Sequence, residues 1–294
     1  MSEAAFFAYC RERYQLMLNR RAGLPQEQWT KDQILRTYRF CNVFREDDKT
    51  TAWFRENVRE PLRNSPHVLW ATLVHRWFNR ITTMEVLNDQ ALGIARGEFH
   101  PQQIRERLLF SLGRGPFITA AYMIKTPAGM DKIDGLLWCL GKIHPDVEHL
   151  AHHMNPEEAS LEGVWGVLRE YPYLGDFMSY EIVTDLRHTA LLDGTADINT
   201  WANPGPGAAR GLARVEGVSL DTYDRQKAQD RALLIQGMQR LLERSRHPDN
   251  WPADWPAWEM REVEHSLCEF DKYERARLGE GRPKELFKVR TDEK

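Results

Sequence analysis

Apolar side chains recur along most of the chain at the three- to four-residue spacing of amphipathic helices. Residues 3–21 carry such a stripe, in which Phe6, Cys10 and Met17 fall on one face. The same spacing predicts helices at 50–60, 67–80, 83–96 and 101–112, a long helix at about 221–246 and a last helix after residue 258. Strict alternation of apolar and polar residues, which indicates strands, is almost absent. We therefore predict an all-α protein.

Length and composition narrow the class of protein. The 294 residues suffice for one large domain or two ordinary ones, and a hydrophobic fraction of 42% is that of a globular chain. Four cysteines without a C-x-x-C pair argue against a zinc ribbon, an iron–sulfur loop and a disulfide framework. No apolar run is long enough to span a bilayer, and the first residues are too short and acidic for a signal peptide. We expect a cytoplasmic protein without membrane contact.

Two segments are candidates for DNA contact, although a formal net charge of -3 offers no average attraction to nucleic acid. Residues 272–294 hold eight Lys or Arg against five Asp or Glu. In EYPYLGDFMSYEIVTDLRH (170–188), a Pro-x-x-Gly turn leaves backbone N–H groups at a helix N-terminus, which suits a phosphate. An ordinary helix–helix turn fits the same pattern. The Gly-x-Phe pattern of this turn recurs at 115–124 and predicts a second such joint.

The loop ADINTWANPGPGAARG (196–211) begins about twenty residues after that turn, and its glycines and prolines exclude a helix interior. In helix–hairpin–helix DNA glycosylases a catalytic Asp follows the hairpin Gly at about this distance, and Asp197 matches that position. Tyr173 departs from the pattern, because the hairpin usually has another Gly there. Phe177 stands where bifunctional glycosylases carry Lys. Lyase chemistry through a Schiff base is therefore not expected.

Two further segments concentrate polar residues. In TYRFCNVFREDDKT (37–50), Arg39, Asn42 and Arg45 recur at three-residue spacing among aromatic neighbours, which fits either a salt-bridged surface helix or a functional face. In HPDVEHLAHHM (144–154), histidines at 149, 152 and 153 could hold a metal on one helical face. No carboxylate beyond Glu148 completes the ligand set. A solvated histidine cluster is the favoured interpretation, and we predict no metal site.

The segment EHSLCEFDKYER (264–275) has the densest set of ionisable groups. A helical wheel predicts a buried stripe of Met260, Val263, Leu267 and Phe270. Polar residues border that stripe, namely Glu264, His265, Cys268, Glu269, Asp271, Lys272, Tyr273 and Arg275. Polar groups beside a buried face cost free energy unless they are paired with other protein groups or bind a ligand. The segment is therefore either a functional site or a solvated charge run.

Four stretches resemble the α-glutamyl/putrescinyl-thymine pyrophosphorylase family: RTYRFCNVFREDDKTT, YLGDFMSYEIVTDLRHT, DINTWANPGPGAARGL and REVEHSLCEFDKYERARLGEGRPK. They are most similar to the clade whose helical domain accompanies 5-hydroxymethyluracil DNA kinases in phages with hypermodified thymine. The resemblance covers roughly residues 30 to 287. It implies a helix–hairpin–helix fold like that of the DNA glycosylases, with two helical lobes around a cleft. We expect a single catalytic domain over 1–294, with one lobe of about 1–110 plus a C-terminal helix 258–290, and another of about 111–246.

The activity that the resemblance implies is that of an amino acid:DNA transferase. An amine, from glycine, another amino acid or a polyamine, displaces pyrophosphate from the 5-methylene carbon of 5-(pyrophosphooxymethyl)uracil in double-stranded DNA. A partner 5-hydroxymethyluracil DNA kinase activates the base beforehand, and a phage-encoded protein would act in the host cytoplasm. The chain itself has no G-x-x-x-x-G-K-[ST] loop, so it is not expected to be that kinase. No cofactor is certain, and Mg²⁺ is the candidate companion of pyrophosphate.

Residue roles follow from that chemistry. Pyrophosphate needs cations to neutralise it, the amine needs a base, and the target base must leave the stack. Asp197 is the first choice for the base, and Glu269 is the second. The expected catalytic residues are Asp197, Glu269, Arg45, Arg210 and Lys272. The expected substrate-binding residues are Asn42, at the uracil edge, with Arg39, Asp48, Asp185, Trp201, Glu264, His265 and Tyr273. The expected contacts to the DNA backbone are Tyr173, Gly175, Asp176, Gly205 and Gly207.

Two other functions stay open. A DNA glycosylase acting on a modified pyrimidine would use Asp197 to stabilise an oxocarbenium ion. A non-catalytic DNA-binding scaffold would use the hairpin to hold phosphates. The products separate the three hypotheses, since they are pyrophosphate with an amine adduct, a free base, or no product at all.

Overall fold

The computed structural model describes residues 2–121, 123–283 and 285–287, and over these residues it is helical, as predicted. Within this part, β-structure is limited to an isolated bridge between Tyr38 and Leu286. Residue 284 and residues 288–294, which carry part of the predicted basic patch and the end of the predicted helix 258–290, lie outside the described residues. None of the described helices is long and apolar enough to cross a bilayer.

The chain divides into two compact units. Unit 1 comprises Met1–Asp48 and Asn199–Lys294, and unit 2 comprises Lys49–Ile198. These boundaries differ from those expected for the lobes. Residues 49–110 belong with the middle of the chain, and residues 199–246 belong with its two ends.

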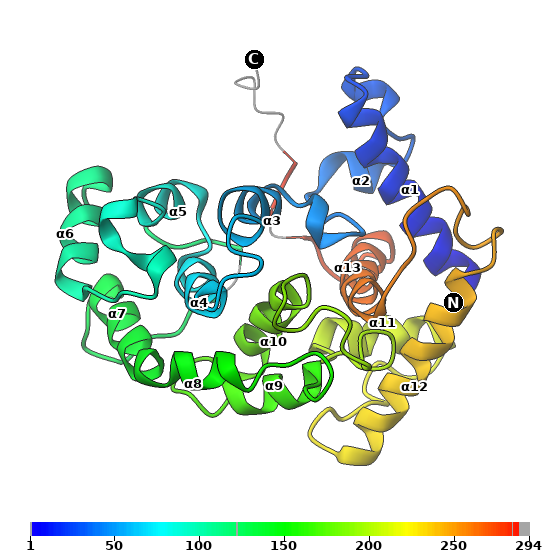
Figure 1. Cartoon of the computed structure of the whole chain (residues 1–294). Helices are drawn as coiled ribbons and strands as arrows, with labels where there is room; N and C mark the ends of the chain where they lie inside the picture. Colours follow the sequence, from blue (N-terminus) through cyan, green and yellow to red (C-terminus); the bar gives the residue numbers. More distant parts are fainter. Residues whose placement is uncertain (1, 122, 284, 288–294) are drawn as a thin grey trace. The chain divides into compact units, whose positions relative to one another are not determined.

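Unit 1 is built around α13 (Met260–Arg277), which packs against the four other α-helices of the unit and most extensively against α11 (Pro206–Glu216) (Figure 1). These helices are α1 (Glu3–Arg21), α2 (Gln33–Thr37), α11 (Pro206–Glu216), α12 (Ala228–Ser245) and α13 (Met260–Arg277), with 3₁₀ turns at Gln26–Gln28 and Arg45–Asp47. The predicted stripe of α13 is confirmed, because Met260, Val263, Leu267 and Phe270 are all 0% exposed. Burial of these side chains removes apolar surface from water and holds the unit together.

Two glycines on the facing side of α11 allow it to approach α13 closely. Gly207 and Gly211 are about one helical turn apart and so share a face. A Cβ atom on Gly211 would lie 2.1 Å from the carbonyl oxygen of Leu267, and one on Gly207 would lie 2.4 Å from Sγ of Cys268. Neither distance is tolerable for a carbon atom. The backbones can therefore pack at this spacing only because Gly211 lacks a side chain, whereas at Gly207 the Cys268 thiol occupies the space that a Cβ atom would take.

Unit 2 is centred on α4, whose residues are all buried, and on α10, which packs against α4 and α9. Its helices are α3 (Lys49–Phe54), α4 (Val68–Phe78), α5 (Ile81–Leu87), α6 (Pro101–Leu112), α7 (Lys132–Ile143), α8 (Val147–His152), α9 (Leu161–Leu168) and α10 (Gly175–Leu186). A π-helical turn follows α3 at Arg55–Arg59, and 3₁₀ turns lie at Gln90–Leu92, Ile94–Arg96 and His144–Asp146.

A buried ion pair joins α4 to α10. Arg76 and Asp185 form a bidentate pair, with both side chains 1% exposed, and Nη1 of Arg59 lies 3.6 Å from Oδ1 of Asp185. Asp185 was expected to bind substrate. Its burial and its guanidinium partners give it a structural part in unit 2 and do not support direct contact with a ligand.

Four predicted helices differ in the structure, and the last of them, expected at 258–290, already ends at Arg277. At 83–96, α5 ends at Leu87 and two 3₁₀ turns follow, because Gly93 and Gly97 adopt positive φ angles of 67° and 81°. The predicted joint at 115–124 is absent, since the described residues between α6 and α7 form no helix. Gly113 and Gly115, with φ of 62° and 92°, end the helical path there. The long helix begins at Ala228 rather than near 221.

The α11–α13 crossing generates a stability prediction. Gly211→Ala should lower the free energy of unfolding by about 1–3 kcal/mol, because α13 must move to admit the new methyl group. The control is Gly166→Ala in α9, where a Cβ atom meets nothing within 4 Å. There alanine should stabilise the helix by about 0.5–1 kcal/mol. Urea denaturation followed by circular dichroism measures the free energy of unfolding of both variants. Equal changes at the two positions would contradict the close packing of α11 against α13 at Gly211.

The start of α13 generates a prediction on pH. The backbone N–H of Glu259 donates to Oε2 of Glu262 (3.0 Å), and burial raises the pKa of Glu262 from 4.5 to about 7. As pH rises, the unfolded chain releases the Glu262 proton before the folded protein does. The contribution of protonated Glu262 to the free energy of unfolding is therefore present at low pH and is lost as pH rises from 4.5 to about 7. The glutamine of Glu262→Gln cannot ionise, so this variant keeps its stability as the parent loses it. Its free energy of unfolding relative to that of the parent should rise by about 2–3 kcal/mol between pH 5 and pH 8.

The matched control for that measurement is Glu243→Gln on α12, whose carboxylate is exposed. Urea denaturation of the three proteins at both pH values gives the comparison. A pH-independent difference between the parent and Glu262→Gln would show that Glu262 ionises equally in both states.

Candidate functional site

The segment 40–48 meets α13 in unit 1, and Glu269 lies at the meeting point. The backbone N–H of Cys41 donates to Oε2 of Glu269 (2.9 Å). Nζ of Lys272 lies 2.7 Å from Oε2 and 3.0 Å from Oε1 of the same carboxylate. The Lys272 ammonium also lies 4.8 Å from the ring centroid of Phe40. Glu269, which is 9% exposed, is therefore held between a loop amide and a cation.

Asn42 holds the loop in shape. Its backbone N–H and its Nδ2 both donate to Oδ1 of Asp48, at 2.9 and 3.0 Å, and Nδ2 also donates to the carbonyl of Asp47 (2.8 Å). Nη2 of Arg13 donates to Oδ1 of Asn42 (2.8 Å). Both N–H groups of the amide are thus used within the protein. The expected contact of Asn42 with a uracil edge would have to replace some of these bonds.

Cys41, Asp48 and His265 bring a thiol, a carboxylate and an imidazole together. One ligand atom from each lies within 4.8 Å of the other two. Burial raises the pKa of Cys41 and of Asp48 above their ordinary values. Burial also lowers the pKa of His265, and the Arg45 guanidinium lowers that pKa further. Burial therefore disfavours the charged form of each of the three groups.

A second polar cluster lies between α11 and α13. Asp271, which is 0% exposed, pairs with Nε of Arg210 (3.0 Å), Arg214 (2.9 Å) and Arg275 (3.4 Å). Arg214 pairs with Glu280 as well. Arg210 is the partner of Asp271 that was expected to be catalytic. Its side chain is 37% exposed, so it can also reach solvent.

Other expected site residues of unit 1 contribute to its loops. The backbone N–H of Gly205 donates to Oε1 of Glu264 (3.0 Å), and Gly207 is buried against Cys268. The Tyr273 hydroxyl donates to Oδ2 of Asp32 (2.5 Å), the N-cap residue of α2. Arg39 forms an exposed ion pair with Glu285 at 2.8 Å, and Trp201 is 7% exposed. The expected DNA contacts of Gly205 and Gly207 stay predictions, but buried Gly207 has a packing part that its sequence context does not reveal.

In unit 2, Asp197 caps a helix. Its two carboxylate oxygens accept hydrogen bonds from the backbone N–H groups of Leu161 (2.8 Å) and Glu162 (3.0 Å) at the start of α9. Such bonds satisfy amides that have no partner within the helix. This geometry fits the capping alternative, and a catalytic part for Asp197 stays a prediction.

The predicted hairpin precedes α10. Tyr173 and Gly175 have positive φ angles of 67° and 55°, and Tyr173 is 41% exposed. Asp176 pairs with Arg169 at 2.7 Å, and its carbonyl accepts from Nε1 of Trp165 (2.9 Å). A turn followed by a helix N-terminus is therefore present where it was expected. Its contact with phosphate stays a prediction.

A profile described as the helical domain of 5-hmdU DNA kinase matches residues 2–282. The chain belongs to this family. A 5-hmdU DNA kinase of Bacillus phage SP10 is 22% identical over 314 residues, which cover 98% of this chain and 48% of the phage protein. The chain thus spans about half the length of that relative. No solved structure shows a significant match.

The family assignment confirms the coarse part of the resemblance, which is kinship with the helical domain of 5-hmdU DNA kinases. The phage relative is, by its name, an enzyme that acts on a modified base of DNA. Membership of the pyrophosphorylase family and the transfer of an amine are finer expectations. These finer expectations stay predictions.

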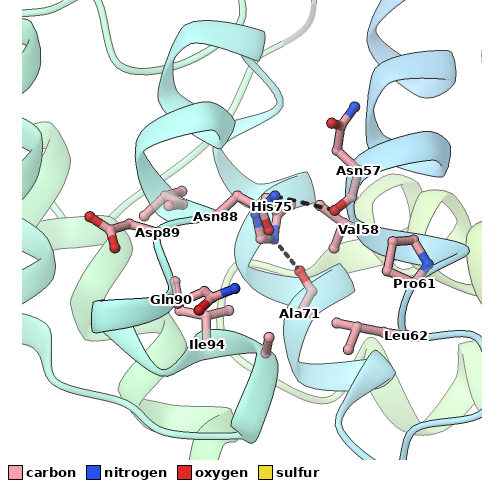
Figure 2. Close-up of a pocket in the computed structure, with 12 residues that line it drawn as sticks. Asn57, Val58, Pro61, Leu62, Ala71, His75, Asn88, Asp89, Gln90 and Ile94 are labelled. Atoms are coloured by element: carbon pink, nitrogen blue, oxygen red, sulfur yellow. Dashed lines mark hydrogen bonds between the residues drawn. The ribbon is translucent and has the colours of Figure 1, made fainter.

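Sequence patterns gave no indication of two features. Cys41 is one of four unpaired cysteines, and its nearness to Asp48 and His265 depends on the approach of segments more than two hundred residues apart. In unit 2 a cavity of about 210 Å³ is lined by Asn57, Asn88 and His75 (Figure 2). Its His75 ring bonds through Nδ1 to the carbonyl of Ala71 (2.7 Å). Histidines 149, 152 and 153, by contrast, contact one another in tilted and edge-on arrangements and form no ligand set with a carboxylate among the described residues.

The capping geometry of Asp197 generates a stability prediction. Asp197→Ala leaves two amides of α9 without acceptors and should lower the free energy of unfolding by about 1–2 kcal/mol. Asp197→Asn keeps one acceptor oxygen, so it should lower the free energy of unfolding by less than half as much as Asp197→Ala. Asp249→Ala, at an aspartate whose side chain is 90% exposed, serves as the control in urea denaturation. A neutral Asp197→Ala variant would show that these amides have other partners in solution.

Proposed function

We propose that this chain transfers an amine to the 5-methylene carbon of 5-(pyrophosphooxymethyl)uracil in DNA and releases pyrophosphate. Support comes first from the family, since the phage relative carries a matching region within a protein named as a 5-hmdU DNA kinase. A kinase of that kind would produce an activated methylene group. The chain has no phosphate-binding G-x-x-x-x-G-K-[ST] loop, so a step after phosphorylation suits it better than phosphorylation itself.

The observation that carries the proposal is the meeting of segment 40–48 with α13 in unit 1. Two stretches that resemble the pyrophosphorylase family there place a carboxylate, Glu269, beside a cation, Lys272, at 2.7 Å. Displacement of pyrophosphate by an amine needs both charges. The carboxylate accepts a proton from the attacking amine, and the cation neutralises the leaving group.

The bonds of the proposed step balance simply. The nitrogen lone pair of the neutral amine forms a bond to the methylene carbon, and the carbon–oxygen bond to pyrophosphate breaks with its electron pair on oxygen. The uracil ring delocalises positive charge that develops on the methylene carbon. The new secondary ammonium then gives one proton to the base. Arg45, Arg210 and Lys272 are the cations proposed to receive pyrophosphate, with Mg²⁺ as a candidate companion.

We prefer Glu269 to Asp197 as the base. Asp197 is engaged through both oxygens by backbone donors of α9, which cannot move away without opening the helix. Glu269 is engaged by the Cys41 amide and by Lys272, whose side chain is 24% exposed and can turn toward a phosphate. Departure of Lys272 toward the leaving group would free one carboxylate oxygen for the amine.

A DNA glycosylase with a related fold is the second candidate. The hairpin before α10, with Tyr173 and Gly175 at positive φ, favours it, because exposed amides at a helix N-terminus suit a DNA phosphate. In that function Asp197 would stabilise a sugar cation rather than accept an amine proton.

The test uses duplex DNA that contains 5-(pyrophosphooxymethyl)uracil, incubated with the protein and a pool of amino acids and polyamines. We expect pyrophosphate release together with an amine-linked nucleoside in mass spectrometry of the digested DNA. Release of a free base would instead support the glycosylase. Absence of any product with the parent protein, under conditions in which it binds the DNA, would contradict both functions.

The role of Glu269 has its own variant. Glu269→Gln should lower turnover by about 10²–10⁴-fold while DNA binding changes little, because the amide keeps the shape but cannot accept the proton. Glu274→Gln, at another paired glutamate of α13, should stay near the parent, since Glu274 pairs with Arg277 outside this cluster. Loss of turnover in Asp197→Asn, with full turnover in Glu269→Gln, would transfer the role of base to Asp197.

A further inference from the structure

We propose that Cys41, Asp48 and His265 form a binding site for one divalent transition-metal ion, with zinc as the preferred ion. A sulfur atom, a carboxylate oxygen and a ring nitrogen from these residues lie within 4.8 Å of one another. Cys41 and Asp48 flank the loop that Asn42 holds, and His265 projects from α13. The three groups thus come from two separate parts of unit 1.

The spacing suits a tetrahedral ion after a small adjustment. Zinc binds sulfur, nitrogen and oxygen at about 2.0–2.3 Å, so two ligand atoms of one ion lie about 3.4–3.8 Å apart. The observed upper limit of 4.8 Å therefore has to shrink by about an ångström. Rotation of the half-buried Cys41 side chain, which lies on a loop, can bring its sulfur atom closer to the other two ligand atoms.

His265 has the surroundings of a ligand rather than of a core histidine. His265 is 9% exposed, and among the described residues its Nε2 has no hydrogen-bond partner. The backbone of Asn42 forms a hydrogen bond with the ring. A metal-bound histidine usually bonds through its other nitrogen to a backbone carbonyl or carboxylate, which fixes the orientation of the ring. An unpartnered buried nitrogen is costly without a ligand.

The carboxylate is oriented in the same manner. Asp48 receives two hydrogen bonds from Asn42 on Oδ1, and Arg13 in turn holds the Asn42 amide. Ligating carboxylates in metal sites are themselves hydrogen-bonded in this way. Asn42 therefore serves two of the three ligands, through its backbone to His265 and through both donors to Asp48.

An ion also removes an electrostatic cost. Burial disfavours the charged forms of Cys41 and Asp48 and raises the pKa of both. A divalent ion stabilises a thiolate and a carboxylate beside it and takes histidine in its neutral form. Of the cations that act on His265, Lys272 and Arg261 are paired with Glu269 (2.7 Å) and Glu46 (3.3 Å), and Arg45 also faces the cluster.

The donor set indicates the class of metal and leaves one position open. A thiolate with an imidazole selects zinc or a related transition ion, whereas Mg²⁺ requires oxygen ligands. Three protein ligands are the number found in catalytic zinc sites, where water or substrate takes the fourth position. If the proposed function holds, a pyrophosphate oxygen is a fitting fourth ligand. The metal site itself does not depend on that function.

Metal binding can be tested without any substrate. The reduced protein, stripped with a chelator, is titrated with Co²⁺, and a thiolate-to-cobalt charge-transfer absorption should appear at one equivalent and disappear when Zn²⁺ is added. Cys41→Ser should abolish that absorption. Asp48→Asn and His265→Gln should each weaken Zn²⁺ binding by at least about 100-fold in a chelator competition. Circular dichroism checks that each variant is folded.

Two control variants separate this site from others. Cys268→Ser changes the neighbouring half-buried thiol and should leave the absorption intact. A His149→Gln, His153→Gln double variant removes stacked surface histidines that could bind metal adventitiously, and it should also bind one equivalent. An unchanged absorption in Cys41→Ser, or zinc affinity lost only with the surface histidines, would overturn the site.

Failure of the site and failure of the proposed function give different results. Stoichiometric metal with no amine transfer would leave the site standing and remove the function. Amine transfer at full rate in metal-free protein, with no charge-transfer band, would remove the site and leave the function.

Discussion

The close approach of α11 and α13 is the constraint on which unit 1 depends. Gly207 and Gly211 bring the two backbones together, and Arg210 and Arg214 on the same helix then reach the fully buried Asp271. A carboxylate in that position is costly by itself, and the guanidinium groups offset its desolvation only at hydrogen-bond distance. Side chains at the two glycines would separate the helices and the charges at once. Packing and electrostatics therefore require the same small residues.

The polar border of α13 holds loops in place. Glu269 accepts from the Cys41 amide, and Glu264 accepts from the Gly205 amide, so two carboxylates of one helix hold the backbone of two loops. Buried backbone donors need such partners, because an unsatisfied amide costs free energy comparable to a lost hydrogen bond. The density of ionisable groups in 264–275 is thus explained in part by loop anchoring. The apolar stripe on the same helix supplies the fixed base from which these groups project.

Periodicity in the sequence predicted what depends on local spacing and missed what depends on distant pairing. The all-α class, the helix at 101–112 and the buried stripe of α13 follow from residues three and four apart. The turns after Leu87 depend on left-handed glycines, whose φ angles no hydrophobic pattern encodes.

The site shows the same limit. Sequence motifs identified 37–50 and 264–275 as candidate segments, and in the structure these two segments contact each other. The partners of single residues could not be read from the sequence. The side-chain N–H groups of Asn42 donate within its own loop, and Asp185 is paired with arginine. The sequence around Cys41 does not indicate that it lies near His265.

The polypeptide passes between its two units at Asp48–Lys49 and at Ile198–Asn199. Asp48 is the last residue of unit 1, and Asp197 is the last but one of unit 2, and each carboxylate is tied to backbone amides of its own unit. At both crossings, a carboxylate within two residues of the boundary is thus bonded to backbone amides of its own unit. An occupant of the Cys41–Asp48–His265 cluster would bind the residue at which the chain leaves unit 1, so it would fix the end of that unit's first segment to α13.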